Sequence, residues 1–112
     1  DYDILLRATV SPDFTRWVDN PLSITYRSTS TGATNNKMDI AVFDTAGSPV
    51  TLSGSSTGLV SSTFTTTELE FTGSPTWTPG SDFLIKMTPF AKDNFEMHIS
   101  DVKLQYVDLA GT

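Results

Sequence analysis

Apolar and polar side chains alternate along most of this chain. In the clearest segment, Leu22, Ile24 and Tyr26 share one face of a strand, and polar residues fill the positions between them. A repeat of two residues is typical of a strand with one buried face, whereas an amphipathic helix repeats about every 3.6 residues. No window of the sequence keeps the helical spacing for more than a turn. The chain is therefore predicted to be all-β.

Further segments repeat this pattern between turn-forming residues. A first strand is expected over residues 4–10, and an irregular edge strand over residues 59–65 within a Ser/Thr-rich loop. The other apolar sets are Met38/Ile40/Val42, Val50/Leu52, Leu69/Phe71, Phe83/Ile85/Met87, Phe95/Met97/Ile99 and Val102/Leu104/Tyr106. Clusters of Gly, Pro, Asn and Asp, such as residues 19–21, are expected to separate the strands. About eight short strands with regular turns favour an antiparallel β-sandwich of jelly-roll type.

The last two apolar sets are out of phase, because one occupies odd positions and the other even positions. One residue of slip near Ser100 and Asp101 would bring both sets to the same face, which is what a β-bulge does. With that slip, alternation predicts a single core. Its expected members are Leu22, Ile24, Tyr26, Ile40, Val42, Phe83, Ile85, Met97, Ile99, Val102 and Leu104.

Length and composition narrow the class of protein. A chain of 112 residues with no linker is expected to form one domain over residues 1–112. It has no cysteine and one histidine, which excludes disulfides, thiolate metal sites and multi-histidine sites. A net charge of −6 argues against a nucleic-acid partner. No apolar run approaches the ~18 residues that a membrane helix needs, so no membrane partner is expected.

The sequence offers no catalytic signature. His98 is the only histidine, and no nucleophile motif accompanies it. The aspartates lack the spacing of an EF-hand, and they are interpreted as residues that solubilise turns and edges. The alternative is that loop carboxylates bind a structural calcium ion, which prefers oxygen ligands. We therefore expect no enzyme activity, no catalytic residues, no metal site and no cofactor.

Two tryptophans lie in polar, turn-rich segments. An exposed indole is a good platform for stacking a sugar ring, so Trp17 and Trp77 are candidate ligand-stacking residues. The alternative is that each indole plugs one end of the sandwich.

Two stretches are candidate interfaces. Residues 53–67 carry no charge and contain Leu59, Val60 and Phe64. The second stretch holds Phe14, Trp17 and Val18 beside turn residues. An exposed apolar stretch of this kind should bind a second copy of the chain or another protein. The alternative is that both stretches fold back over the ends of the sandwich.

The order of these segments resembles a known family of modules. Residues 6–14, 22–28, 38–48, 79–86 and 97–106 together look like the jelly-roll β-sandwich modules of tailed-phage virions. Such modules occur as head decoration (cement) proteins, head fibres and tail-spike domains, often as trimers. The resemblance implies a non-enzymatic protein on the capsid surface of a virion. It also implies two kinds of partner, namely further copies of the chain, with a trimer expected, and a capsid shell protein.

A second resemblance leads to a different function. Residues 99–104 look like the closing strand of jelly-roll carbohydrate-binding modules, which often carry a carboxylate in that bend. Asp101 matches this feature, whereas Ser100 departs from the acidic pair sometimes seen there. This resemblance implies a carbohydrate- or receptor-binding module of a fibre or a secreted protein.

Overall fold

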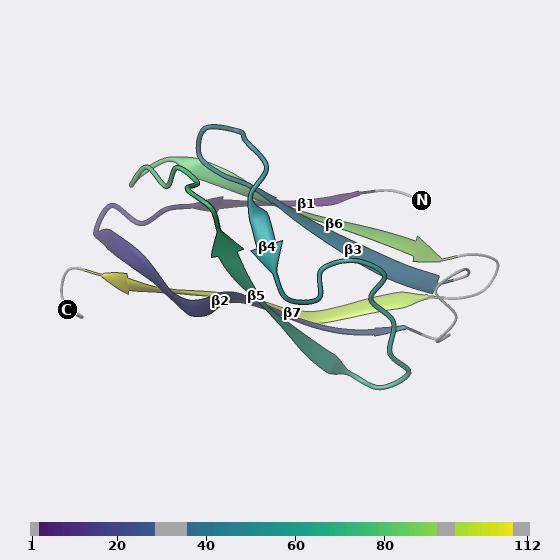
Figure 1. Cartoon of the computed structure of the whole chain (residues 1–112). Helices are drawn as coiled ribbons and strands as arrows, with labels where there is room; N and C mark the ends of the chain where they lie inside the picture. The colour runs from purple at the N-terminus through teal and green to yellow at the C-terminus, as the bar shows by residue number, and fades with distance from the viewer. Residues whose placement is uncertain (1–2, 29–35, 92–95, 109–112) are drawn as a thin grey trace.

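The computed structural model describes residues 3–28, 36–91 and 96–108 and shows two antiparallel sheets (Figure 1). The strands are β1 (Ile4–Thr9), β2 (Phe14–Ser28), β3 (Asn36–Phe43), β4 (Thr51–Ser53), β5 (Thr65–Thr72), β6 (Asp82–Ala91) and β7 (Met97–Asp108). One sheet has the order β1-β6-β3 and the other the order β4-β5-β2-β7. The described residues include no helix, and therefore no helix that could cross a membrane. The all-β prediction is confirmed.

The core lies between the two sheets and follows the predicted alternation. Every second side chain is buried along β3, in residues 22–28 of β2 and in residues 83–87 of β6. The buried apolar residues are Val10, Leu22, Ile24, Tyr26, Met38, Ile40, Val42, Val50, Leu59, Leu69, Phe83, Ile85 and Met87. The predicted core members on β7, which is an edge strand, are half-buried and pack against this core. They are Met97, Ile99, Val102 and Leu104.

The strand pairs are nested along the chain. β4 pairs with β5, β3 with β6, and β2 with β7, as though one long hairpin had been folded across itself. β1 adds to the outer side of β6, and β5 also pairs with β2. Most contacts therefore join residues that are far apart in the sequence.

The predicted bulge lies at the expected place. Thr25 of β2 pairs with Asp101, but its neighbour Tyr26 pairs with Ile99, so Ser100 is the extra residue on β7. Because of this slip, Ile99 and Val102 both pack against the core. The two strands expected at the C-terminal end are thus one bulged strand, and the described residues form seven strands in all. Phe95 lies outside the described residues.

Residues 19–21 were expected to separate two strands, and this prediction is wrong. They lie within β2, which runs without interruption from Phe14 to Ser28. The register with β7 shifts here, since Trp17 pairs with Tyr106 and Leu22 with Leu104. Asn20 absorbs the irregularity with a φ of 48°, and its N–H donates to Glu70 Oε1 at 2.7 Å. Asparagine tolerates this left-handed conformation better than most residues.

The edge strand expected over residues 59–65 is also not observed as a strand. Leu59 makes an isolated antiparallel bridge with Met38, and each residue's N–H donates to the other's carbonyl, at 2.9 and 3.0 Å. The N–H of Ile40 donates to the carbonyl of Ser56, and that of Ser28 to the carbonyl of Ser61, both at 2.7 Å. The segment therefore covers the outer edge of β3 and ties it to the end of β2.

Candidate functional site

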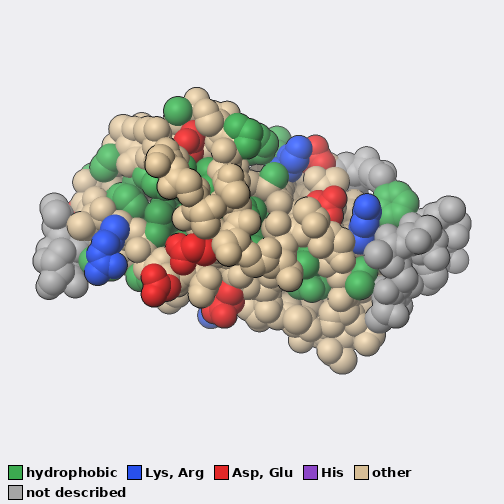
Figure 2. Space-filling model, viewed as in Figure 1, with side chains coloured by type: hydrophobic (Ala, Val, Ile, Leu, Met, Phe, Trp, Pro, Cys, Tyr) green, Lys and Arg blue, Asp and Glu red, His purple; other side chains and the backbone are tan. Residues whose placement is uncertain are grey.

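Six aromatic rings gather at one end of the sandwich, around Trp17. The ring of Trp17 lies 5.0 Å from Phe14, 5.2 Å from Trp77 and 5.9 Å from Phe83, between centroids. The other two members are Phe71 and Tyr106. These residues come from both sheets and from the loop before β6, and Figure 2 shows hydrophobic side chains gathered at this end. Aromatic pairs contribute about 0.5–1.5 kcal/mol each beyond their burial, so this aromatic cluster holds the sheets together.

The structure brings together the two tryptophans predicted for ligand stacking. Their indoles meet nearly edge to face, at 82°, and both are half-buried. The Nε1 atom of Trp17 is buried and has no hydrogen-bond partner among the described residues. Trp77 also packs against Phe71, with ring centroids 5.1 Å apart. Trp17 is thus surrounded by side chains of its own chain, and Trp77 covers one side of it.

Phe14 and Val18, predicted as interface residues with Trp17, lie on β2 rather than on a loop over the end. Both are half-buried, and Phe14 contacts Trp17 and Tyr106. The sequence did not indicate Phe71, Phe83 or Tyr106 as members of the aromatic cluster. One feature of the sequence could have indicated them. Each lies at the start or end of an expected strand, and strand ends from different parts of the chain meet at one end of a sandwich.

The three apolar residues of the other predicted interface differ in exposure. Leu59 is only 5% exposed and belongs to the core, so the expectation that it serves an interface is wrong. Val60 is half-buried, and Phe64 is 55% exposed. The guanidinium of Arg27 lies over the Phe64 ring, 5.6 Å from its centroid. The interface expected from residues 53–67 is therefore reduced to Val60 and Phe64.

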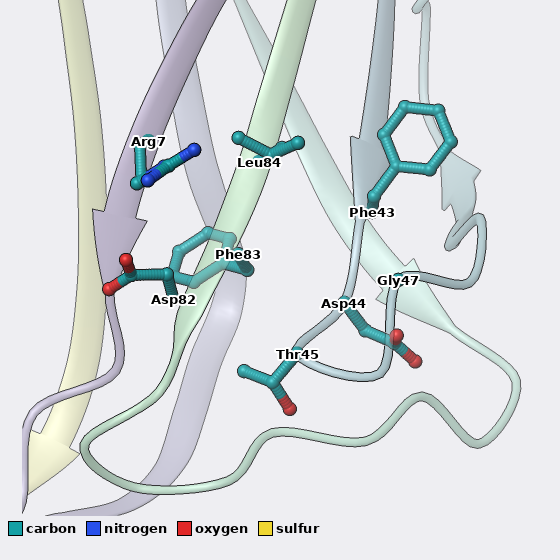
Figure 3. Close-up of a pocket in the computed structure, with 8 residues that line it drawn as sticks. All are labelled: Arg7, Phe43, Asp44, Thr45, Gly47, Asp82, Phe83 and Leu84. Carbon is teal, nitrogen blue, oxygen red and sulfur yellow. The ribbon is translucent and has the colours of Figure 1, made fainter.

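An open depression of about 420 Å³ lies beside the turn after β3 (Figure 3). Its floor is the outer face of the three-stranded sheet, where Arg7, Leu84 and Phe43 form one row across the strands. Asp82 lies at its rim and accepts a hydrogen bond from the Thr9 hydroxyl at 2.6 Å. The depression offers apolar contact and one cation.

The second carboxylate at this depression, Asp44, is occupied by backbone groups. Its Oδ2 accepts the N–H of Thr76, and its Oδ1 accepts the N–H groups of Ser48 and Ala46, each at 2.9 Å. The N–H of Thr76, followed by that of Ser48, holds the pKa of Asp44 below its ordinary value. Asp44 is therefore a structural carboxylate, and its lowered pKa favours the ionised form at neutral pH.

The remaining titratable pair lies on the surface. His98 Nε2 is 3.1 Å from Glu96 Oε1, and both side chains are exposed to solvent. Within residues 3–28, 36–91 and 96–108, no hydroxyl hydrogen-bonds to His98, and no three His, Asp or Glu side chains lie close enough to hold a metal ion.

Comparison of the chain with models of protein families, with curated proteins and with solved structures finds no match.

Proposed function

We propose that this domain is a jelly-roll module of a tailed-phage virion, which decorates and stabilises the capsid shell and has no enzymatic activity. The observation that supports it is the nested pairing of β4 with β5, β3 with β6 and β2 with β7. A jelly roll has this arrangement, because it forms when one long antiparallel hairpin wraps into two sheets. The domain departs from the eight-stranded form in two pairings, since β1 pairs with β6 and β5 pairs with β2.

The contact surface of this module is Phe64, together with Val60 of the same loop. Residues 56–61 are fixed to β3 and β2 by backbone hydrogen bonds, so the start of this surface is already ordered. Ser61 also binds the Thr65 hydroxyl, 2.8 Å away, which restrains the turn that carries Phe64. A preordered apolar side chain loses little conformational entropy when it binds, which favours the complex.

The mechanism is a non-covalent clamp. Phe64 packs either against another copy of the domain, with a trimer as the expected state, or against a capsid shell protein. The oligomer bridges neighbouring shell subunits at the capsid surface. Because the clamp binds the assembled shell more tightly than free subunits, binding shifts the equilibrium toward the assembled state.

Light scattering and co-sedimentation with tailed-phage capsid shells test this proposal. We expect Phe64→Asp to weaken self-association and shell binding, because it places a charge at the centre of the contact. Ser74→Asp adds the same charge at an exposed loop position and serves as the matched control. A domain that is monomeric as wild type and does not bind shells contradicts the clamp.

The carbohydrate-binding alternative predicts a different outcome of the same work. The sugar-binding module would be supported by a monomer whose tryptophan fluorescence changes on titration with oligosaccharides, provided that Trp77→Ala abolishes this change.

The absence of enzymatic activity is tested with ester, peptide and glycoside substrates. Turnover that disappears in His98→Ala would contradict it.

A further inference from the structure

The outer edge of β1 is a sheet edge with no partner strand among the described residues. β1 is the terminal strand of the order β1-β6-β3. The N–H of Val10 donates to the carbonyl of Ser81, at 2.9 Å, so the backbone of Val10 faces the β6 side. In an antiparallel ladder the backbone groups of successive residues face opposite sides, so Ile4, Leu6 and Ala8 also bond toward β6. The N–H and C=O groups of Leu5 and Arg7 therefore point away from the sheet.

This edge carries apolar side chains and few of the features that protect sheet edges. Leu5 is 61% exposed and Leu6 is 38% exposed. Natural edge strands are usually protected from pairing with another chain by proline, lysine, bulges or covering loops. β1 has no proline, no lysine and no register shift against β6, and its single charge is Arg7. Residues 56–61 cover the opposite edge of the same sheet, at β3, but not this one.

The sequence of the edge is complementary to itself in the antiparallel direction. Asp3, Leu5 and Arg7 alternate with Ile4 and Leu6. If two copies pair about a two-fold axis at Leu5, each Asp3 lies opposite Arg7 of the other copy. Leu5 then lies opposite Leu5, and Ile4 opposite Leu6. We propose that the partner of this edge is β1 of a second copy of the chain, and that the two three-stranded sheets join into one six-stranded sheet.

The charges and the backbone select this register. The outward-facing backbone groups of Leu5 and Arg7 restrict pairing to registers that differ by two residues. A shift of two in either direction places Leu5 opposite Arg7 or Asp3, and so separates the opposite charges. Arg7 makes no ion pair within the described part of the chain and is exposed, so it is free to pair across the axis. Asp3 accepts the Thr88 hydroxyl at 2.8 Å through Oδ1, which orients its carboxylate on the same face.

The pairing is independent of the proposed function and uses a different surface from Phe64. A two-fold contact gives a dimer by itself. If the trimer expected through Phe64 also forms, the two contacts together give an even-numbered assembly.

A charge-swap series tests the pairing by light scattering. We expect wild type to reach twice the 12.2 kDa of one chain as protein concentration rises. Arg7→Asp places two carboxylates opposite each other at both ends of the contact, and Asp3→Arg places two guanidinium groups there. Because two cross-strand ion pairs become repulsive, each reversal should weaken dimerisation roughly ten- to hundred-fold. The double variant Asp3→Arg/Arg7→Asp restores opposite charges and should dimerise again, which shows that the single variants are not merely unfolded.

Two further measurements complete the test. Arg16→Asp makes the same charge change at an exposed position of β2 and should leave dimerisation unchanged. Amide hydrogen exchange should show that Leu5 and Arg7 become protected with rising concentration, while Leu6 is protected at all concentrations. A wild-type monomer at millimolar concentration would overturn the inference, as would a dimer that persists in Arg7→Asp. Association that is lost in Phe64→Asp and kept in Arg7→Asp would support the clamp and overturn the β1 pairing.

Discussion

Asp44 ties the turn after β3 to the loop before β6 by accepting the backbone N–H of Thr76 at 2.9 Å. The same carboxylate accepts two N–H groups inside its own turn, from Ala46 and Ser48. Asp44 is only 6% exposed, and three backbone N–H groups lose a charged acceptor if the carboxylate is removed or neutralised.

Asp44→Asn should lower the melting temperature at neutral pH and flatten its dependence on pH. The side-chain amide oxygen of this variant can still accept hydrogen bonds within the turn, but its NH₂ group would face the N–H of Thr76. The wild-type pKa is lowered below the ordinary value of 3.8, so the stabilisation by Asp44 is complete above that value. It is lost as the pH falls through the lowered pKa. Thermal melts from pH 7 to pH 2 measure this.

The control for Asp44 is Asp19→Asn, which removes one carboxylate at an exposed position. A wild-type acid transition that is retained in Asp44→Asn would show that other carboxylates determine it.

Much of the core could be predicted from the sequence, because a strand with one buried face has apolar residues at every second position. Leu22, Ile24 and Tyr26 could be assigned to one buried face from their alternation alone, without knowing which strands pair with β2. The slip at Ser100 was also predictable, since a change of phase within a continuous apolar pattern requires an extra residue.

The partners of each strand could not be predicted in the same way. The aromatic cluster around Trp17 depends on long-range pairing, which a local pattern does not encode. Leu59 lies in a Ser/Thr-rich stretch without alternation, and it is buried because its backbone bonds to Met38 on a distant strand. Residues 19–21 have the composition of a turn, but pairing with β7 on both sides keeps them within β2.

Truncation of Ile85 should destabilise the domain strongly. Ile85 is fully buried on β6 and pairs with Leu6 on one side and Val42 on the other. Ile85→Ala should cost about 2–5 kcal/mol in urea denaturation, through lost burial and the cavity that remains. Ile40→Ala on β3 should have a similar effect. The neighbouring Leu84→Ala removes as many atoms from the outer, half-buried face and should cost clearly less. Equal effects at 84 and 85 would contradict the register of β6.

Gly54 should not tolerate a side chain. Its φ is +113°, and a Cβ atom there would lie 2.6 Å from the backbone oxygen of Glu68. Gly47 provides the matched control, because its φ is +84° and a Cβ atom would meet no atom within 4 Å. Gly47→Ala should cost about 1–2 kcal/mol, from the left-handed conformation only. Gly54→Ala should cost more, since β5 must also move away, and chemical denaturation of both variants measures the difference.

Deletion of Ser100 should be tolerated, although it lies in the middle of a strand. Without this residue, Asp101 and Ile99 become neighbours that pair with Thr25 and Tyr26 one to one. Ile99 and Val102 would then alternate regularly and remain on the same face, so we expect a loss of about 1 kcal/mol or less. Deletion of Lys103 is the control, because it would turn Leu104 and Tyr106 to the opposite face. That variant should be severely destabilised or unfolded. Circular dichroism melts of the two deletions measure the contrast, and a Ser100 deletion as unstable as the Lys103 deletion would show that the bulge itself is required by the fold.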